Sequence, residues 1–315
     1  MTINLGDLDA HEQPSDELRA EWKSLPLSET GFVSAGSISK NQLTEAFKQL
    51  GLSQEVQEDA QIIHHPLLPG LLILPNLVPE NVQQKLLELM IHRDLSNPNH
   101  QTNMHLHFKV PYESLDPGAS FFSHGPDSPP PPSTPRTPPS TGPSPSARFS
   151  TASFTGSPWA ATPRFPADIA GFLQALFPET QAQAAIVNFY TPGDTMMMHR
   201  DVSEESDRGL VSLSLGCDGI FMIAPSKGPQ DEGEKEDASA AELPRGRYLT
   251  IPLRSGDAIY MTKESRYAWH GVPKVIKGTC PAHLENFPAT EDGQYEEWRG
   301  WMKNKRVNLN VRQIK

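Results

Sequence analysis

The segment from Asn188 to Asp201 ends in a His-x-Asp pair, formed by His199 and Asp201. On an extended segment, side chains two residues apart point to the same side, so this imidazole and this carboxylate can bind one metal ion together. Two histidines and one carboxylate, with the remaining positions open, are the ligands of non-haem Fe(II) oxygenases. The pair therefore raises the question of whether the chain supplies a second histidine and a cosubstrate site.

A His-x-Asp pair is a weak signal by itself, because a second copy occurs at His92-Arg93-Asp94. The residues after that copy resemble the catalytic loop of protein kinases. No glycine-rich loop and no Val-Ala-Ile-Lys strand accompany it, and His92 lies at the end of a helical pattern, where His and Arg are favourable. The sequence therefore argues against a kinase, and the specific signal must come from what surrounds His199.

Two later segments add to the first pair. His270 stands at the end of a predicted strand, within Tyr267-Ala-Trp-His-Gly271. The C-terminal strand has polar side chains on one face, namely Arg306, Asn308, Asn310 and Arg312. Such a face needs a buried polar partner, and a dicarboxylic cosubstrate supplies one because guanidinium groups match carboxylates. Either arginine alone is more typical of a solvated edge strand, but the pair after three metal ligands indicates a function.

The elements that must position these residues are mostly short strands. They are predicted at 71–74, 184–190, 210–215, 219–224, 247–252, 257–262, 267–270 and 306–312. This density of strands and turn signals favours a double-sheet jelly roll, or double-stranded β-helix. Apolar residues at helical spacing predict helices over 41–50, from Pro79 to about His92, and over 166–177. The predicted fold class is α+β, with a jelly-roll core, an N-terminal helical extension and disordered inserts.

Composition divides the 315 residues into four parts. Residues 1–55 are predicted to form an acidic, mostly disordered arm, with little periodicity up to residue 38. Residues 56–112 are an N-terminal extension of the main domain. Residues 113–157 are a Pro/Ser-rich disordered insertion, either a spacer or a site for regulatory partners through its Ser-Pro and Thr-Pro steps. Residues 158–315 form the jelly-roll domain.

The two cysteines, Cys217 and Cys280, indicate a reducing compartment without a disulfide framework. No apolar run approaches the roughly 18 residues of a membrane helix, and the acidic N-terminus is unlike a secretory signal. We therefore expect an intracellular monomer with no membrane partner, in the nucleus or the cytoplasm, with a mitochondrial pool left open.

The ordered motifs resemble the AlkB family of Fe(II)/2-oxoglutarate dioxygenases, over about residues 65–112 and 158–315. The matching features are Asn188-x-Tyr190, His199-x-Asp201, the strand 211–216, Ser255-Gly-Asp257, His270-Gly271 and the ending Arg306-x-Asn308-x-x-x-Arg312. The last of these is most similar to the branch of the first eukaryotic AlkB homologue, in a fungal form.

The resemblance implies a role for each residue. His199, Asp201 and His270 bind Fe(II), and 2-oxoglutarate chelates the iron through its keto acid end. The far carboxylate pairs with Arg306, within a cosubstrate site that includes Asn188, Tyr190 and Asn308, and molecular oxygen takes the last open position. Arg312 lies near Asp201 and the cosubstrate and orients the catalytic site.

The resemblance also implies a substrate class, an N-methylated base in tRNA or DNA that is demethylated oxidatively. The sequence adds a modestly basic C-terminal stretch, whose exposed members are expected to contact phosphate. Its residues are Arg299, Lys303, Lys305, Arg306, Arg312 and Lys315. The motifs do not separate this activity from hydroxylation or demethylation of a protein such as a histone. A non-catalytic interaction module is a third hypothesis, which the complete ligand set argues against.

Several chemically capable residues have a simpler interpretation. Met196, Met197 and Met198 are predicted to fill the core, with one or two pointing inward beside the metal. Asp257 is predicted to begin a strand after a tight turn, and Cys217 to be a buried structural thiol. His105 and His107 are predicted to be partly exposed strand histidines.

Overall fold

The structure is a computed structural model, and it describes residues 27–28, 30–97, 120, 122–123, 126, 151–153, 165–202, 204–226 and 248–315. The helices are α2 (Lys40–Gln49), α3 (Glu80–Leu87), η2 (Glu88–Leu95), α5 (Ala167–Leu176), η5 (Lys263–Tyr267), α6 (Ala282–Glu285), η6 (Glu296–Trp298) and η7 (Trp301–Asn304). The strands are β1 (Val33–Ile38), β2 (Ala60–His64), β3 (Leu71–Leu74), β4 (Thr151–Ser153), β5 (Ala184–Tyr190), β6 (Met196–His199), β7 (Leu210–Gly216), β8 (Gly219–Ala224), β9 (Leu249–Leu253), β10 (Ala258–Met261), β11 (Trp269–Val275) and β12 (Arg306–Arg312). In these described ranges, no helix has the length and apolar character needed to cross a membrane. Expectations for residues 1–26, His105 and His107, and most of the proline-rich insertion lie outside the described residues.

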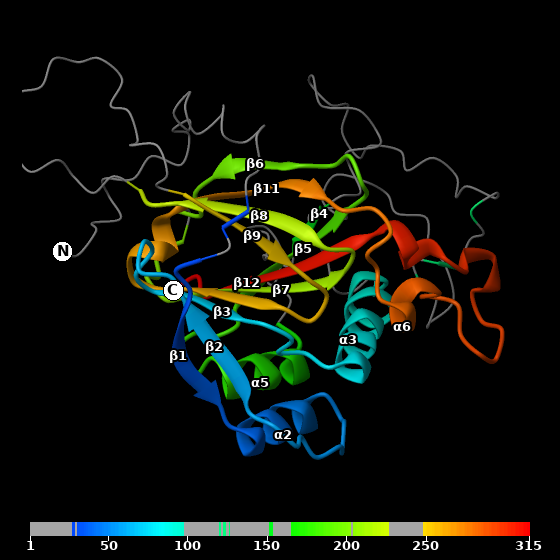
Figure 1. The fold of residues 1–315 in the computed structure, drawn as a ribbon. Helices are drawn as coiled ribbons and strands as arrows, with labels where there is room; N and C mark the ends of the chain where they lie inside the picture. Colours follow the sequence, from blue (N-terminus) through cyan, green and yellow to red (C-terminus); the bar gives the residue numbers. More distant parts are fainter. Residues whose placement is uncertain are drawn as a thin grey trace, which may run out of the picture.

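Two antiparallel sheets form the centre of the molecule (Figure 1). Among the described residues, the large sheet has the order β1-β2-β3-β10-β7-β12-β5-β4 and the small sheet the order β6-β11-β8-β9. The C-terminal strand β12 is hydrogen-bonded to β5 on one side and β7 on the other, so it lies in the middle of the large sheet. This two-sheet arrangement is consistent with the predicted jelly roll.

Strand β12 shows how the sequence separates the two faces of the large sheet. Val307, Leu309 and Val311 are at most 2% exposed and belong to the main apolar core. Their side chains alternate with those of Arg306 and Asn308, which line a pocket between the sheets. The period of two along a strand therefore gives the sheet an apolar outer face and a polar inner face.

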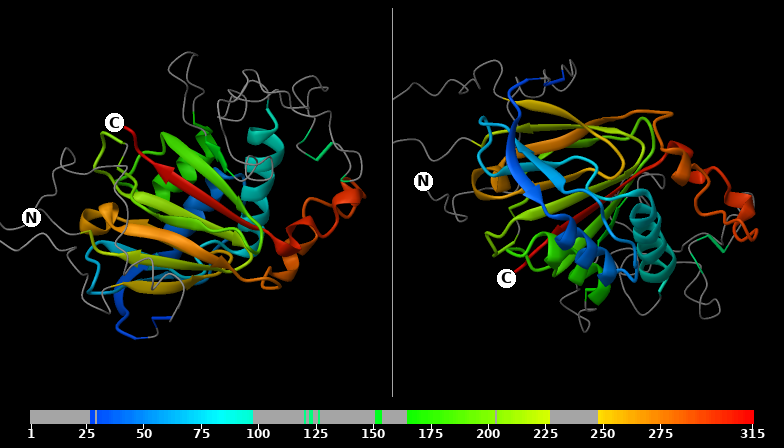
Figure 2. Two further views of the ribbon diagram at one scale, coloured as in Figure 1. Left: turned by 90° about the horizontal axis from the view of Figure 1, so that it is seen from above. Right: turned by 60° about the horizontal axis from the view of Figure 1, so that its bottom comes forward.

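Helices cover the outer face of the large sheet, where α2, α3 and α5 lie side by side (Figure 2). In the pair α2 and α5, the Phe47 and Phe172 rings stack with centroids 6.2 Å apart, and Gln42 Nε2 donates to Ala175 O at 2.8 Å. Ser39 Oγ accepts from Gln42 N and caps the start of α2. The helices predicted over 41–50 and 166–177 are confirmed.

The predicted mobile arm is wrong for Val33–Ile38. Residues 33–38 form β1, which pairs with β2 at the edge of the large sheet, and α2 follows directly. The sequence shows little periodicity here because the order comes from pairing with β2 and packing on α5. Further upstream, Ser28 N donates to Thr250 O at 2.9 Å, and Thr250 N donates to Ser28 Oγ at 3.1 Å, along the outer edge of β9.

The second His-x-Asp copy lies in η2, a π-helix that continues the predicted helix to Leu95. The His92 ring stacks on the Tyr295 ring with centroids 4.9 Å apart. Asp94 forms an ion pair with Arg93, which also pairs with Asp168. This copy is part of the packing between η2 and its neighbours, and it lies on a helix as the sequence predicted.

Candidate metal centre and carboxylate pocket

The three predicted metal ligands lie together at the paired ends of two strands of the small sheet. His199 on β6 is the register partner of His270 on β11, and their ring centroids are 4.5 Å apart. Asp201 Oδ1 lies 3.9 Å from His199 Nε2, and its Oδ2 lies 3.6 Å from His270 Nε2. One donor atom from each residue lies within 4.8 Å of the others, so the group could hold one metal ion.

Hydrogen bonds fix which nitrogen of each ring faces Asp201. His199 Nδ1 lies 2.8 Å from the Met197 carbonyl, and His270 Nδ1 lies 2.9 Å from the Ala268 carbonyl. A carbonyl can only accept, so Nδ1 carries the proton in each neutral ring and Nε2 presents a lone pair. Burial, and then the neighbouring His270, lower the pKa of His199 below its ordinary value of 6.5. Both features suit metal binding.

Asp201 is held in its ionised form. Burial by itself raises its pKa, but the contact with His270 and the positive charge of Arg312 outweigh it and keep the pKa far below its ordinary value. Arg312 Nη2 donates to Asp201 Oδ2 at 3.2 Å, and Nη1 of the same guanidinium donates to Glu204. Arg312 therefore lies directly behind the predicted metal ligand.

A β-bulge explains the arrangement of the three methionines. From Met196 to His199, β6 advances three residues while its partner β11 advances two, from Val272 to His270. The extra residue breaks the alternation, so Met196 and His199 both line the pocket, whereas Met197 is 59% exposed. Met198 packs outward in a small cluster with Met222, Ala224 and Trp269. The prediction that one or two of the methionines point inward holds for Met196.

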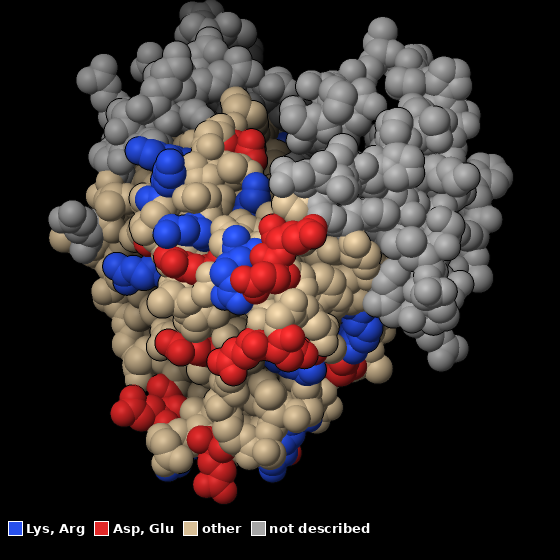
Figure 3. Space-filling model, turned by 90° about the vertical axis from the view of Figure 1, so that its right-hand side faces the viewer, with Lys and Arg blue, Asp and Glu red and all other residues tan. Residues whose placement is uncertain are grey.

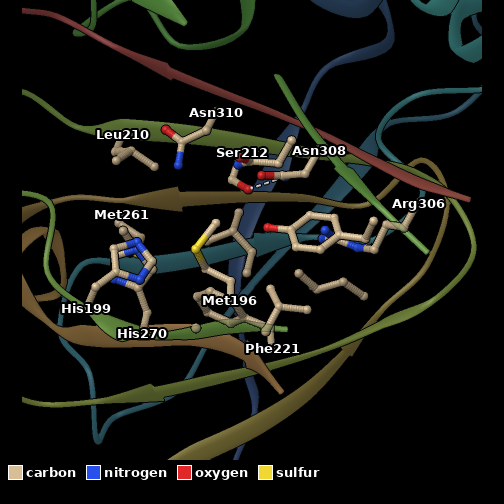
Figure 4. Close-up of a pocket in the computed structure, with 16 residues that line it drawn as sticks. Met196, His199, Leu210, Ser212, Phe221, Met261, His270, Arg306, Asn308 and Asn310 are labelled. Atoms are coloured by element: carbon tan, nitrogen blue, oxygen red, sulfur yellow. Dashed lines mark hydrogen bonds between the residues drawn. The ribbon is translucent and has the colours of Figure 1, made fainter. Parts of the chain in front are cut away.

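The pocket runs between the sheets from the histidine pair to Arg306 (Figure 4). In this view His199 and His270 lie on one side, Arg306 lies on the other, and Met196 lies between them. Its walls are lined by Asn188, Tyr190, Met196, His199, Leu210, Ser212, Phe221, Leu253, Ile259, Met261, His270, Gly271, Val272, Arg306, Asn308 and Asn310. It is therefore a mixed pocket, apolar in the middle and polar at both ends.

Arg306 is 1% exposed, yet most of its guanidinium lacks a partner. Nη2 donates to Ser214 Oγ at 2.9 Å, but Nε and Nη1 are buried and have no hydrogen-bond partner among the described residues. Burial lowers the pKa of Arg306, and the Tyr190 ring lies 5.3 Å from its Cζ. A buried cation with two unpaired donor nitrogens matches a carboxylate, so the residues present fit the far end of 2-oxoglutarate.

The other residues predicted to bind the cosubstrate, Asn188, Tyr190 and Asn308, also line the pocket. Asn188 and Tyr190 line the pocket from β5. Asn308 also lines it, but its Nδ2 donates to Ser212 Oγ at 2.8 Å and to Leu213 O at 2.9 Å. Its amide nitrogen is therefore used within the sheet, joining β12 to β7.

The basic C-terminal stretch, whose exposed members were predicted to contact phosphate, divides into buried and exposed residues. Arg306 and Arg312 are buried, Arg299 pairs with Glu296, and Lys303 lies 3.9 Å from Glu285. Across the middle of the face in Figure 3, basic and acidic side chains lie next to one another. The alternation of side chains along β12 turns Arg306 and Arg312 toward the interior, so neither arginine lies on the surface.

Two predictions about nearby polar residues are confirmed. The Asp257 carboxylate accepts backbone hydrogen bonds from Asn76 at 2.8 Å and Arg254 at 2.7 Å, so it fixes a turn. Cys217 is 1% exposed and is a free thiol. Its Sγ donates to Lys303 O at 3.4 Å, in keeping with a structural role.

Comparison with known proteins identifies the fold family. Residues 70–312 match the family described as the 2OG-Fe(II) oxygenase superfamily. This chain belongs to that superfamily. Its site contains a three-residue group that could hold a metal ion and a buried arginine with unpaired donor nitrogens.

Similar oxygenases with curated names include fungal proteins. A relative from Pyricularia oryzae, named N6-methyladenosine RNA demethylase ALKB1, is 53% identical over 357 aligned positions that cover 100% of both chains. A relative from Schizosaccharomyces pombe, named tRNA demethylase abh1, is 39% identical over 49% of this chain and 46% of its own length. A solved structure described as "The structure of OsALKBH1" is 16% identical, with a TM-score of 0.43 over 78% of this chain and 98% of that chain.

Glu204, Ser214 and Arg266 lie at the site although no sequence motif pointed to them. Glu204 is 6% exposed and Arg266 is 1% exposed, and they form an ion pair directly behind Asp201. Burial alone raises the pKa of Glu204, but Arg312 and Arg266 outweigh it and hold the pKa below its ordinary value. Only closeness in sequence to the metal ligands could have pointed to the charged pair, because Glu204 follows Asp201 by three positions and Arg266 precedes His270 by four.

Proposed function

We propose that this oxygenase has a jelly-roll core and removes methyl groups oxidatively from N-methylated bases in nucleic acid. One observation supports the chemistry above all others. The pocket has at one end His199 and His270, which form a possible metal-binding group with Asp201, and at the other end the partly unpaired Arg306. The substrate class rests on the curated names of the relatives, which include an RNA demethylase that matches the whole chain.

In this proposal each end of the pocket has one task. His199, Asp201 and His270 bind Fe(II) through their Nε2 atoms and one carboxylate oxygen. Arg306 binds the far carboxylate of 2-oxoglutarate with Nε and Nη1. When bound, Fe(II), 2-oxoglutarate and oxygen supply the oxidation, in which 2-oxoglutarate becomes succinate and carbon dioxide.

The remaining pocket residues orient the cosubstrate and exclude water. Tyr190 and Asn188 lie on the β5 side of Arg306, and Met196 and Phe221 give the middle of the pocket an apolar lining. Arg312 keeps Asp201 ionised and oriented. A methyl group hydroxylated on a base nitrogen then loses formaldehyde, which leaves the unmethylated base.

We infer that an unpaired base is the form that enters. Reaching a methyl group inside a duplex requires flipping the base out of its stack, at a cost of about a few kcal/mol. An RNA loop or a single strand avoids most of that cost.

We further propose that the protein acts as a monomer in the nucleus or cytoplasm. Its two buried free thiols are in keeping with a reducing compartment.

The test measures succinate and formaldehyde after Fe(II), 2-oxoglutarate and oxygen are added to purified protein. Substrates are matched RNA oligonucleotides with and without N6-methyladenosine, a methylated tRNA and a methylated DNA strand. We expect formaldehyde only with a methylated nucleic acid, and none from His199→Ala. Succinate without formaldehyde on every nucleic acid would redirect the substrate to a protein, and no succinate from protein with iron bound would refute the catalytic proposal.

A further inference from the structure

Glu204 and Arg266 are buried, oppositely charged residues that the proposed chemistry does not use directly. Their side chains are 2% and 1% exposed, and Arg266 Nη2 lies 2.9 Å from Glu204 Oε2. The other oxygen of Glu204 accepts from Nη1 of Arg312. A carboxylate buried between two guanidinium groups carries a desolvation cost that a well-packed apolar group would avoid. Its position behind the metal centre points to a function there.

Glu204 determines how Arg312 contacts the metal ligand. A guanidinium facing a single carboxylate commonly binds both of its oxygens in parallel. Here Nη1 of Arg312 donates to Glu204, Nη2 donates to Asp201 Oδ2 at 3.2 Å, and Nε has no partner among the described residues. The contact with Glu204 fixes the angle at which the guanidinium meets Asp201, so that one nitrogen contacts one carboxylate oxygen. Asp201 Oδ1 is left facing His199 Nε2, 3.9 Å away. The ligand carboxylate therefore keeps one oxygen turned toward the histidines.

Arg266 contacts both Asp201 and Glu204, and so restrains the two acidic residues that pair with Arg312. Its Nη1 donates to the backbone carbonyl of Asp201, and its Nη2 donates to Glu204. Its Nε donates to the carbonyl of Arg208 at 3.1 Å, at the far end of the same loop. One side chain thus fixes the backbone of the ligand residue together with the carboxylate that restrains Arg312.

From this geometry we infer that Glu204 and Arg266 are positioning residues for the metal site. They hold the Arg312 guanidinium at an angle where Nη2 contacts only Oδ2 of Asp201, and so leave Oδ1 available to the metal ion. The inference rests on the proposed function only in placing a metal ion at His199, Asp201 and His270. It predicts that losing Glu204 weakens metal binding even when the protein remains folded.

The experiment titrates metal-free full-length protein with Co(II), a probe for sites of this ligand type, and follows the ligand-field absorption of the bound ion. Thermal unfolding of each metal-free variant reports its folding. The variants are Glu204→Ala, Glu204→Asp and the double variant Glu204→Ala with Arg266→Met. The matched control is Glu205→Ala, which removes the same charge from the neighbouring exposed position.

We expect Glu204→Ala to raise the Kd for Co(II) by about 10- to 100-fold, the range typical of residues that orient metal ligands. Glu204→Asp keeps the charge but is too short to contact both arginines, so its Kd should also rise. The double variant removes the unpaired Arg266 and should recover thermal stability without recovering Co(II) affinity. Glu205→Ala should match the wild type.

Three results would overturn the inference. The first is a Co(II) affinity in folded Glu204→Ala equal to that of the wild type. The second is an affinity that returns with stability in the double variant, which would mean that the pair supports folding alone. The third is a wild-type affinity in Glu204→Asp, which would mean that charge rather than position matters. A wild-type protein that binds no Co(II) would instead refute the metal centre, and this inference with it.

Discussion

The two ends of the pocket are built in opposite ways. At the histidine end, His199 lies on the edge strand β6 with 38% of its side chain exposed, and the negative charge of Asp201 is balanced by Arg312. At the other end, Arg306 lies on β12 in the middle of the large sheet, 1% exposed, with two N–H groups unpaired among the described residues. The histidine end is therefore partly exposed and its carboxylate is paired with an arginine, whereas the Arg306 end is buried and its positive charge has no acidic partner among the described residues.

This difference indicates how each ligand is recognised. The histidine end holds its geometry through hydrogen bonds within the protein, so a metal ion meets ligands that are already oriented. The Arg306 end leaves a buried cation without a full set of partners, which is costly until an anion binds. Cosubstrate binding should therefore stabilise the fold as well as supply a reactant.

The largest effect is expected from Asp201→Ala, which removes the negatively charged ligand at the histidine end. Co(II) binding and succinate formation should both fall to background, because two histidines alone do not complete the ligand set. Asp94→Ala, in the other His-x-Asp copy, is the matched control and should bind Co(II) like the wild type. Co(II) binding that survives in Asp201→Ala would show that the metal site lies elsewhere.

The next largest effect is expected from Arg306→Met, at the other end of the pocket. Hydrogen bonds to a charged group contribute about 1.5–3 kcal/mol each, so losing two should raise the Kd for 2-oxoglutarate about 100-fold or more. The metal-free, cosubstrate-free variant should unfold at the same or a higher temperature than the wild type, because a poorly paired buried charge is gone. Calorimetry of Co(II)-loaded protein and thermal unfolding measure the two effects.

Arg254→Met is the control for that variant, since it removes an exposed arginine. It should leave the affinity for 2-oxoglutarate unchanged. If Arg306→Met lowered the unfolding temperature of the ligand-free protein by several degrees, the guanidinium would have partners that the structure does not show, and the contrast between the two ends would fail.

A smaller effect is expected from Gly219→Ala. An added Cβ would lie 2.6 Å from Arg306 Nε and 2.9 Å from its Cδ, so the guanidinium must move. We expect the KM for 2-oxoglutarate to rise by about 10-fold, below the roughly 100-fold cost of a full 1 Å misplacement, while Co(II) affinity stays unchanged. A change in Co(II) affinity without a change in the KM for 2-oxoglutarate would contradict the view that the histidine end binds the metal and the Arg306 end binds the cosubstrate.

The smallest effect is expected from pH, and it should act at the histidine end. Burial lowers the pKa of His199 from 6.5, so Co(II) affinity should be nearly constant above pH 6.5 and fall as protons compete below it. In metal-free protein the unfolded chain takes up the proton before the folded chain does, so this histidine also makes folding less favourable as pH falls below 6.5. Titrations of Co(II) between pH 5.5 and 8 would test this, and a flat profile would contradict it.

The sequence predicted the parts of the site that local geometry determines. The alternation along β12 places Arg306 and Asn308 on the inner face, and this follows from the period of a strand alone. The two His-x-Asp copies were also separable, because His92 lies in a helical pattern and His199 in an extended one. The bulge in β6 and the contacts of Glu204 and Arg266 depend on register and tertiary packing, for which the sequence carries no periodic signal.

The error in the predicted arm also has a physical origin. Assigning residues up to 38 to a disordered arm ignored pairing partners that are distant in sequence, since β1 is ordered by β2 and not by its own pattern. An interaction between distant segments therefore orders this part of the chain.

The contact between Ser28 and Thr250 has a consequence for solubility. It occupies backbone groups on the outer edge of β9, where the small sheet ends. An unpaired sheet edge is a template for pairing with another chain, and covering it is a common protection against aggregation. A chain shortened to begin at Phe32 should therefore scatter more light at equal concentration than the full-length protein, although its pocket is untouched.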